Sequence, residues 1–392
     1  MKTQPLIRVA LIHDWLTGMR GGESVLEAIA ELFPTAELHT LIHLKGRVSS
    51  RIESLPIHTS FLQAIPGVER RYRHFLPCMP AAVSRFDLRS FDLVISSSHC
   101  VAKGVRKAPQ AVHVSYIHAP MRYMWDRFRD YFGPGRASGS VRLAAKLLRP
   151  FFQAWDRRVS QADRVDRLIG NSKFIARQIE LCYGRKAQVI HPFADLSRFS
   201  APRQPGPSYL MVGAFAPNKR VDLAIEAFNR LKLPLRIVGE GQEGERLRRL
   251  AGPSIEFLGS LSNERIAELY SQSRAFVFPG LEDFGITPVE ALAAGLPVIA
   301  FGQGGALESL DAKTGVFFPE QTVESLMEAV QKLESGAVVI REEDCRARAR
   351  HFTRERFQSE LLEQVRAAWL DAGKPAAKLE SIISSPSGAL RS

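Results

Sequence analysis

The sequence has no apolar run of the roughly 18–20 residues that a membrane-spanning helix requires. Near its start, the apolar stretch before His13 and Asp14 is only about six residues long, too short for the hydrophobic region of a signal peptide. A buried first strand accounts for this stretch better. We therefore expect the protein to stay in the cytoplasm.

Residues for metal sites and disulfides are few and scattered. The four cysteines, Cys78, Cys100, Cys182 and Cys345, show no Cys-x-x-Cys spacing, so neither a zinc site nor a disulfide framework is indicated. No Asp-x-Asp pair follows a predicted strand, so a bound divalent cation is not expected. We expect free, buried thiols and a function that needs no metal ion or other cofactor.

Length and charge limit the classes of function. A chain of 392 residues with 45% hydrophobic and 24% charged residues is typical of two globular domains. The formal net charge of +12 favours an anionic partner: a nucleic acid, an anionic membrane face or a phosphorylated ligand. No helix-turn-helix, RRM or KH pattern is present, which argues against a nucleic acid.

Short apolar segments alternate with helical segments along both halves of the chain, which is typical of parallel βαβ units. The expected strands of the first half are residues 7–12, 93–96, 112–117, 167–170 and 188–190. Those of the second half are residues 209–212, 235–238, 255–258, 275–278 and 297–301. The predicted fold is therefore α/β, with two Rossmann-like, doubly wound parallel-sheet domains facing a cleft.

Domain boundaries follow from composition. Residues 200–208 contain three prolines and a glycine, which is typical of an interdomain linker. We expect an N-terminal domain over 1–199 and a C-terminal, ligand-binding domain over 200–353. A helix over 354–373 is expected to pack back on the N-terminal domain, and residues 374–392 are expected to form a flexible tail.

The segment 278–291 contains a strand end, a loop and the start of a helix. Thr287 is suited to the N-cap and Pro288 to the first helical position, and Glu290 would complete a Thr-x-x-Glu capping box. Backbone N–H groups at the positive end of this helix would form a phosphate site. The residues that would contribute them are Phe284, Gly285, Ile286 and Thr287.

Two carboxylates flank this expected phosphate site. Glu282 lies in the loop and Glu290 in the first helical turn. Carboxylates repel phosphate but accept strong hydrogen bonds from sugar hydroxyls. The alternative is that Glu290 only caps its helix and Glu282 is solvated.

Other glycine turns and polar residues follow predicted strands. Lys219 and Arg220 open a helix after the turn at 213–218, where they would clamp a diphosphate unless they are ordinary surface cations. Gly21 and Gly22 open a helix after the first strand, as a ligand loop or as a tight turn. His118 follows the strand 112–117, where ligand-binding loops lie in parallel α/β domains; the alternative is a structural histidine.

Taken together, the segment 278–291 resembles the Glu-x7-Glu motif of family 4 (group 1) glycosyltransferases, a retaining group with the GT-B fold. Residues 291–300, 304–308 and 314–318 are similar to the segments that follow this motif in the family. The resemblance covers most of the chain and is strongest from about 165 to 320. It implies that Glu290 binds the donor ribose hydroxyls and that Glu282 acts at the transferred sugar.

The resemblance also assigns roles to the glycine turns. The family usually reads Val-Gly-Arg-x-x-x-x-Lys at 212–219, and both cations contact the donor diphosphate. This chain keeps Lys219 but has Ala214 at the arginine position, which weakens the expected clamp unless Arg220 substitutes. Gly239, after the next strand, lies in the region that is near the nucleotide base in the family.

In the N-terminal half, the resemblance implies that Gly21 and Gly22 face the donor phosphate and that His118 lies beside the transferred sugar. The expected catalytic residues are thus Glu282, His118 and Lys219. The expected donor-binding residues are Glu290, Gly285, Ile286, Thr287, Phe284, Gly21, Gly22, Arg220 and Gly239.

Residues 13–16, 21–23 and 116–126 resemble bacterial mannosyltransferases of surface polysaccharide assembly. This implies GDP-mannose, or another nucleotide-diphosphate sugar, as donor and a polyprenyl-diphosphate-linked saccharide at the inner membrane face as acceptor. Two alternatives remain: a non-catalytic scaffold subunit that binds nucleotide sugars, and a sugar-phosphate epimerase of the same two-domain shape.

A predicted helix over 141–158 suggests a peripheral membrane contact. Apolar side chains lie among basic ones, as in helices that bind anionic lipid; a core helix with a solvated basic face is the alternative. The apolar residues are Leu143, Leu147, Leu148, Phe151 and Trp155, and the basic ones are Arg142, Lys146 and Arg149.

Overall fold

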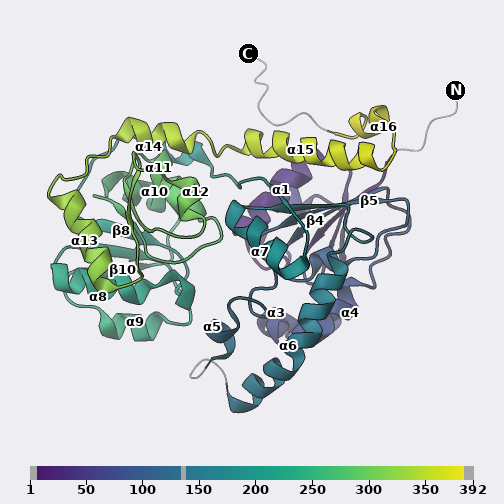
Figure 1. Cartoon of the computed structure of the whole chain (residues 1–392), viewed down its shortest axis with the longest axis horizontal. Helices are drawn as coiled ribbons and strands as arrows, with labels where there is room; N and C mark the ends of the chain where they lie inside the picture. The colour runs from purple at the N-terminus through teal and green to yellow at the C-terminus, as the bar shows by residue number, and fades with distance from the viewer. Residues whose placement is uncertain (1–6, 134–137, 384–392) are drawn as a thin grey trace. The chain divides into compact units, whose positions relative to one another are not determined.

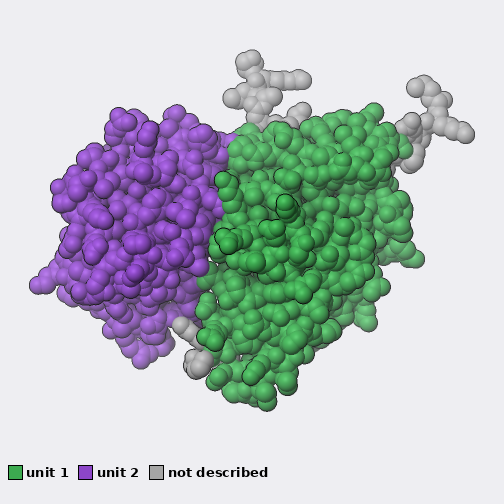
Figure 2. Space-filling view, viewed as in Figure 1, with its two compact units in different colours: residues 1–191, 355–392 green, residues 192–354 purple. Residues whose placement is uncertain are grey.

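The computed structural model describes residues 7–133 and 138–383 and divides into two compact units (Figure 2). Unit 1 comprises residues 1–191 and 355–392, and unit 2 comprises residues 192–354. Each unit contains one parallel sheet with helices around it, which confirms the predicted α/β fold class (Figure 1).

Unit 1 is built on a seven-stranded sheet in the order β3-β2-β1-β4-β5-β6-β7. The strands are β1 Val9–His13, β2 Glu37–Thr40, β3 Ile57–Thr59, β4 Leu93–Ser98, β5 Val112–Ile117, β6 Arg167–Gly170 and β7 Gln188–Val189. The strands β1, β4 and β5 are buried throughout, as their apolar runs predict. The strand order reverses between β1 and β4, because β2 and β3 lie on one side of β1 and β4 to β7 lie on the other. In doubly wound sheets, ligands bind beyond the carboxyl ends of the strands at such a point.

Helices surround this sheet. They are α1 Gly21–Leu32, α2 Ser50–Glu53, α3 Val68–Arg71, α4 Met79–Val83, α5 Phe128–Phe132, α6 Gly139–Val159, α7 Lys173–Tyr183, α15 Arg354–Asp371 and α16 Ala376–Glu380, with short 3₁₀ turns η1 Phe61–Ala64, η2 Tyr72–Cys78 and η3 Ala102–Gly104. The helix α15 packs on the rest of unit 1, where Gln358 donates to the carbonyl of Ala28 at 3.0 Å (Figure 1).

The long helix α6 is anchored through its carboxyl-terminal half. Asp156 lies 2.5 Å from Nζ of Lys103, and both side chains are fully buried. The other Asp156 oxygen accepts hydrogen bonds from Nε1 of Trp125 and from the hydroxyl of Tyr183, each at 2.9 Å. This network pairs two charges in the core that would be costly to leave unpaired.

Unit 2 is built on a six-stranded sheet in the order β10-β9-β8-β11-β12-β13. The strands are β8 Tyr209–Val212, β9 Leu235–Val238, β10 Ile255–Gly259, β11 Phe276–Phe278, β12 Val298–Phe301 and β13 Gly315–Phe318. The helices are α8 Val221–Leu231, α9 Gly244–Leu250, α10 Asn263–Gln272, α11 Ile286–Ala293, α12 Ala306–Ser309, α13 Val323–Glu334 and α14 Glu342–Ala349, with 3₁₀ turns η4 Leu196–Phe199 and η5 Pro217–Lys219. Here the reversal lies between β8 and β11.

The segment 200–208, expected to link two domains, lies inside unit 2, which begins at Pro192. The guanidinium of Arg346 donates to the carbonyls of Phe199 at 2.8 Å and Ala201 at 2.9 Å. Arg203 donates to the carbonyl of Ser273 at 2.6 Å. These contacts fix a proline-rich segment against its own unit, and composition alone does not reveal them.

The tail expected over 374–392 is wrong for its first part. Residues 376–380 form α16, and Leu379 and Ile382 are buried. Nε1 of Trp369 donates to the carbonyl of Pro375 at 3.1 Å, and Lys374 lies over the Trp369 ring. A few apolar residues in a segment rich in small residues are therefore enough to pack a short helix. Residues 384–392 lie outside the described residues.

Among the described residues, no helix is long and apolar enough to cross a bilayer.

Candidate functional site

In unit 2, the loops after β8 and β11 bring two expected residues into contact. Nζ of Lys219 lies 2.8 Å from Oε1 of Glu282. The same oxygen accepts a hydrogen bond from Nδ2 of Asn218 at 3.1 Å. Both loops follow the carboxyl ends of neighbouring strands at the point where the strand order reverses, the usual ligand position in such sheets.

Glycines allow these loops to approach closely. A Cβ at Gly280 would lie 2.6 Å from the carbonyl oxygen of Asn218. The N–H of Gly305 donates to the carbonyl of Glu282 at 2.9 Å, and a Cβ at Gly305 would lie 2.1 Å from Cα of Phe284. The pair Gly304 and Gly305 thus supports the backbone that carries Glu282.

The start of α11 differs from the prediction. The helix begins at Ile286, and its N-cap is Gly285 with φ of 86°, so the Thr287 N-cap and the Thr-x-x-Glu capping box are wrong. A Cβ at Gly285 would lie 2.7 Å from the Phe278 ring, so only glycine makes this turn. The first N–H groups of a helix have no acceptor within it, so those of Ile286 and Thr287 suit an anion.

Glu290 does not cap α11 and is instead held by two other side chains. The hydroxyl of Tyr270 donates to Oε2 of Glu290 at 3.2 Å, and Nη1 of Arg198 lies 3.7 Å from Oε1. Burial raises the pKa of Glu290, although Arg198 and the Tyr270 hydroxyl oppose the rise. A largely buried carboxylate with a raised pKa is typical of a ligand-binding group.

The remaining expected residues of unit 2 line the loops after β8 and β9. Gly239 has φ of 134°, and a Cβ there would lie 1.9 Å from the carbonyl oxygen of Gly213. Arg220 adopts the left-handed region with φ of 52°, and its Nε pairs with Asp222 at 3.2 Å. Ala214 is exposed, so the family's arginine would have had room at this position.

In unit 1, three residues meet where β1, β4 and β5 end. Nδ1 of His13 lies 3.2 Å from the hydroxyl of Ser97, which lies 2.8 Å from Nε2 of His118. Asn171 donates to the carbonyl of His118 at 3.0 Å and fixes its backbone. Burial, with His99 and His13 adding to it, holds the pKa of His118 well below its usual range.

The glycine turn approaches the same histidines. Gly21 and Gly22 begin α1, and a Cβ at Gly22 would lie 3.7 Å from both Nε2 of His118 and Cε1 of His13. Glu23, in the first turn of α1, lies 3.9 Å from Nε2 of His13. The expected residues Gly22 and His118 therefore belong to one cluster.

Asp14 holds the loop that follows β4. Its two oxygens accept hydrogen bonds from the backbone N–H groups of His99, Cys100, Val101 and Ala102, at 2.6 to 2.9 Å. Burial alone would raise the pKa of Asp14, but His99, His13 and these backbone groups outweigh burial and lower it.

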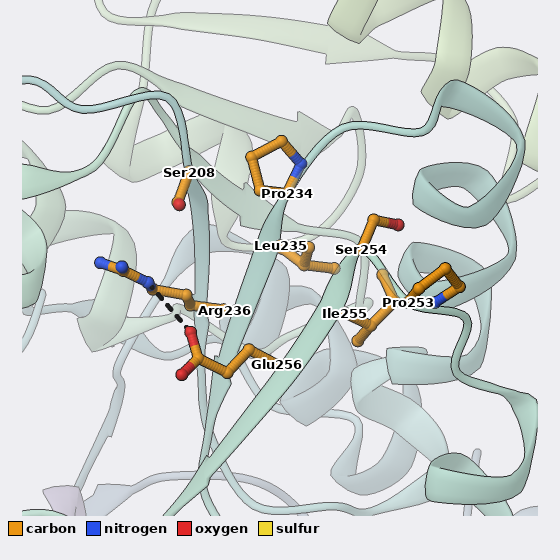
Figure 3. A pocket seen from close by; sticks show the side chains of 8 residues that line it. All are labelled: Ser208, Pro234, Leu235, Arg236, Pro253, Ser254, Ile255 and Glu256. Carbon is orange, nitrogen blue, oxygen red and sulfur yellow. Dashed lines mark hydrogen bonds and ion pairs between the residues drawn. The ribbon is translucent and has the colours of Figure 1, made fainter.

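A surface pocket in unit 2 lies away from these residues (Figure 3). It is lined where β8, β9 and β10 begin, by Ser208, Pro234, Leu235, Arg236, Pro253, Ser254, Ile255 and Glu256. Nε of Arg236 pairs with Glu256 at 3.2 Å across two strands. Since ligands of such sheets bind at the carboxyl ends of the strands, this pocket is not a donor site.

Helix α6 exposes apolar side chains over its amino-terminal turns. The exposed residues are Val141, Leu143, Leu147, Leu148 and Phe151, and Arg142 and Lys146 lie beside them. Two residues expected on this face are instead structural. Trp155 packs on the core near Gly104, and Arg149 donates to the carbonyls of Met124 and Trp125, each at 2.9 Å.

Several residues of these clusters were missed from the sequence. Asn218, Tyr270 and Arg198 were given no role of their own, because their contacts with Glu282 and Glu290 join segments that are far apart in the chain. His13 and Asp14 were noticed as part of a fragment without a role, and their place at a strand end was the available signal. Within the described residues, no group of three or more His, Cys, Asp or Glu side chains is arranged to hold a metal ion.

Two family models match the chain. Residues 20–198 match the model described as Glycosyltransferase Family 4, and residues 194–352 match the one described as Glycosyl transferases group 1. The first match begins after His13 and covers Gly22, Ser97 and His118 of that cluster. The second match covers Lys219, Glu282 and Glu290.

Several curated proteins are similar over part of their length. The D-inositol 3-phosphate glycosyltransferase of Rhodococcus erythropolis is 30% identical over 238 residues, which is 52% of this chain and 54% of that protein. The O-antigen chain mannosyltransferase C of Escherichia coli is 32% identical over 134 residues, 32% of this chain and 36% of that protein. The GDP-mannose-dependent alpha-mannosyltransferase of Mycolicibacterium smegmatis is 39% identical over 95 residues, 24% of this chain and 25% of that protein. The matches thus span about half of these relatives or less.

Solved structures match over nearly the whole chain. Sucrose-phosphate synthase from Thermosynechococcus elongatus has a TM-score of 0.68 at 17% identity, over 93% of this chain and 100% of that one. Anabaena HepE in complex with UDP and glucose has a TM-score of 0.65 at 16% identity, over 91% and 98%. The lipopolysaccharide outer core galactosyltransferase WaaB has a TM-score of 0.65 at 15% identity, over 92% and 99%. At such identities the likeness shows the fold alone.

Proposed function

Because this chain carries a family 4 glycosyltransferase domain followed by a group 1 glycosyltransferase domain, we propose that it transfers a hexose from a nucleotide-diphosphate sugar with retention of the anomeric configuration. The observation that carries the proposal is the contact between Lys219 and Glu282, 2.8 Å apart beyond the carboxyl ends of β8 and β11. A cation at this point suits the diphosphate of such a donor, and a carboxylate suits its sugar.

Each half of the donor has a matching group. The ammonium of Lys219 and the N–H groups of Ile286 and Thr287 would take up the negative charge of the leaving diphosphate. Glu282 would accept hydrogen bonds from the transferred sugar, and Glu290 from the ribose. When the donor is absent, Glu282 neutralises Lys219; when it binds, the diphosphate would replace that carboxylate.

We further propose GDP-mannose as donor and a polyprenyl-diphosphate-linked saccharide as acceptor, in cell-surface polysaccharide synthesis. The similarity to an O-antigen chain mannosyltransferase and to a GDP-mannose-dependent mannosyltransferase supports this choice. The similarity to a D-inositol 3-phosphate glycosyltransferase makes a small phosphorylated acceptor the competing outcome. Transfer is expected without a metal ion, so a chelator should leave the rate unchanged.

An acceptor with a lipid anchor requires the enzyme to reach the cytoplasmic membrane face. The exposed apolar residues of α6, with Arg142 and Lys146 beside them, support a proposed contact with anionic lipid. Binding to vesicles that contain anionic lipid tests this contact.

A two-stage experiment tests the proposed reaction. Nucleotide sugars are first screened by thermal shift, where a ligand at 100 times its dissociation constant adds about 2.7 kcal/mol of stability. The stabilising donor is then incubated with acceptor and with the variant Glu282→Gln, which should fold but lose transfer. Glu256→Gln is the matched control, because Glu256 pairs with Arg236 at 3.2 Å in the same sheet away from the site.

The outcomes separate the alternatives. Donor binding without turnover would favour a scaffold subunit, and conversion of the donor without acceptor would favour an epimerase. If no nucleotide sugar stabilises the protein, or if E282Q transfers normally, the proposal is wrong.

A further inference from the structure

Four side chains of unit 1 lie in series and end at His118, joined by two contacts of hydrogen-bond length and, between Glu23 and His13, one wider ion-pair contact to a buried nitrogen without a hydrogen-bond partner. Oε1 of Glu23 lies 3.9 Å from Nε2 of His13, and Nδ1 of His13 lies 3.2 Å from Oγ of Ser97. Oγ of Ser97 in turn lies 2.8 Å from Nε2 of His118. His13, Ser97 and Glu23 are each buried.

One end of this series carries a fixed negative charge. Oε2 of Glu23 accepts the backbone N–H of Arg20 at 3.2 Å, which leaves Oε1 facing His13. Burial alone would raise the pKa of Glu23, but the interaction with His13 outweighs burial and lowers it. Glu23 is therefore ionised at neutral pH, and it favours a proton on the His13 nitrogen nearest to it.

The proton on His13 decides the direction of the next hydrogen bonds. A neutral imidazole has one N–H and one lone pair, and a hydroxyl has a single proton to donate. When His13 carries a single proton and that proton is on Nε2, beside Glu23, Nδ1 is an acceptor and Ser97 donates to it. Ser97 can then only accept from His118, which requires the proton of His118 to be on Nε2.

The other nitrogen of His118 is the one left for a ligand. Nδ1 has no hydrogen-bond partner among the residues that the structure describes, and His118 as a residue is only partly buried. The lowered pKa of His118, caused by burial and by His99 and His13, keeps the ring neutral. The chemistry that His118 offers therefore depends on which of its tautomers is present.

We propose that Glu23, His13 and Ser97 are positioning residues that hold His118 in its Nε2–H tautomer, so that Nδ1 is a hydrogen-bond acceptor for a hydroxyl of the sugar substrate. This inference rests on the proposed sugar transfer and adds to it the polarity of the contact. It assigns a function to the histidine at the end of β1 and to the glutamate in the first turn of α1.

The variant Glu23→Gln should reverse the donor and acceptor roles along this series of side chains. With its oxygen still accepting the N–H of Arg20, the amide would turn its NH₂ group toward Nε2 of His13. His13 would then carry its proton on Nδ1 and donate to Ser97, and Ser97 would donate to Nε2 of His118. Nδ1 of His118 would become a donor, with no change in shape.

Nitrogen NMR of protein labelled with ¹⁵N-histidine measures these tautomers directly, at about pH 8, above the ordinary histidine pKa of about 6.5. The full chain has ten histidines, and the spectra of His13→Phe and His118→Gln assign two of them. In the native protein, Nδ1 of His118 should give an unprotonated signal and Nε2 a protonated one. In E23Q the two should exchange.

Glu37→Gln is the matched control. Glu37 lies 2.9 Å from Nε2 of His58, an exposed histidine at the edge of the same sheet, so E37Q should change the His58 signals and leave those of His118 unchanged. Ser97→Ala is the second variant: it removes the link, so adding E23Q to S97A should have no further effect on His118.

The activity measurement comes second. E23Q should lower kcat of transfer roughly ten- to a hundredfold, the size expected for losing a hydrogen bond in the transition state, with little change in KM for the donor. A native His118 protonated on Nδ1, or an unchanged His118 in E23Q, would overturn the inference. Because the spectra need no substrate, they remain decisive even if the protein proves not to transfer sugar, which would refute the proposed function instead.

Discussion

The side chains of Lys219 and Glu282 form an ion pair of 2.8 Å, although they follow different strands, β8 and β11. Both are largely buried, with exposed side-chain fractions of 26% and 13%. A donor diphosphate that contacts Lys219 must therefore compete with Glu282 for the ammonium. Replacing Glu282 and replacing Lys219 should therefore have opposite effects on diphosphate binding.

Glu282→Gln should bind free nucleoside diphosphate more tightly, by up to about tenfold, because Lys219 no longer has an anionic partner. The same variant should lose transfer, since its neutral amide is a weaker acceptor for the sugar hydroxyls. Lys219→Met should weaken diphosphate binding by about 1.5–3 kcal/mol, the cost of a charge-assisted hydrogen bond. Titration calorimetry with GDP and UDP measures both, and E256Q should match the native protein. A change in the same direction for E282Q and K219M would contradict the competition.

Glu290 combines a binding role with a cost in stability. Its pKa is raised by burial, so its charged form is disfavoured in the folded protein. The stability that protonated Glu290 contributes is fully present below the unfolded pKa, about 4.3, and is lost as pH rises through the raised folded pKa. Glu290→Gln should therefore be more stable than the native protein at pH 7, and the difference should narrow as the pH falls toward 4.

The same variant should bind the donor about 1 kcal/mol more weakly, because a neutral acceptor replaces a charged one. Urea denaturation at several pH values and calorimetry with the donor measure the two effects. A variant that is less stable at pH 7 would contradict the stability cost assigned to Glu290, and one that binds the donor normally would show that Glu290 does not bind it.

Asp14 stabilises unit 1 through the loop after β4. Asp14→Asn turns an NH₂ group toward backbone donors that now face carboxylate oxygens, and should cost about 2–5 kcal/mol of unfolding free energy. Because the pKa of Asp14 is lowered, its contribution is present above the unfolded pKa and is lost as pH falls through the folded pKa. The difference between D14N and the native protein should thus shrink in acid. Asp87→Asn is the control, because Asp87 is exposed and pairs with the exposed Arg89, a contact that contributes little, so its urea midpoint should stay nearly unchanged. An equally stable D14N would contradict the role.

The strands that the sequence predicted best are those with unbroken apolar runs. Residues 112–117, 209–212 and 235–238 match β5, β8 and β9, because a strand buried on both faces leaves a clear signal. The strands β2, β3 and β13 were missed. The first two are short and carry His39, Thr40 and His58, so their place in the sheet depends on neighbouring strands that the local sequence does not show.

The candidate sites were predicted residue by residue but not as contacts. Lys219 and Glu282 were assigned separate roles, and His118 was considered without Ser97. The order of the strands in each sheet decides which loops meet. That β8 lies beside β11 and β1 beside β4 could not be predicted from the local sequence. The predicted N-cap of α11 was wrong for a local reason. Gly285 adopts a positive φ and caps the helix two residues before Thr287.

The amino-terminal turns of α6 offer the most direct test of a membrane contact. Each basic residue near an anionic surface adds about 1 kcal/mol, so Arg142→Gln with Lys146→Gln should lower binding to anionic vesicles roughly thirtyfold. Arg149 is left unchanged, because it donates to the carbonyls of Met124 and Trp125 and its loss would disturb the fold.

The apolar part is tested separately with Leu143→Ser and Leu147→Ser, whose side chains are 60% and 71% exposed. Because these leucines bury little in the folded protein, their replacement should lower vesicle binding without lowering the melting temperature. Lys45→Gln with Arg47→Gln removes the same charge from an exposed loop of the same unit and serves as the control. Sedimentation with vesicles of stated phosphatidylglycerol content measures all three variants. Equal losses in the control and in the R142Q/K146Q variant would show that net charge alone, rather than α6, attracts the protein to anionic surfaces.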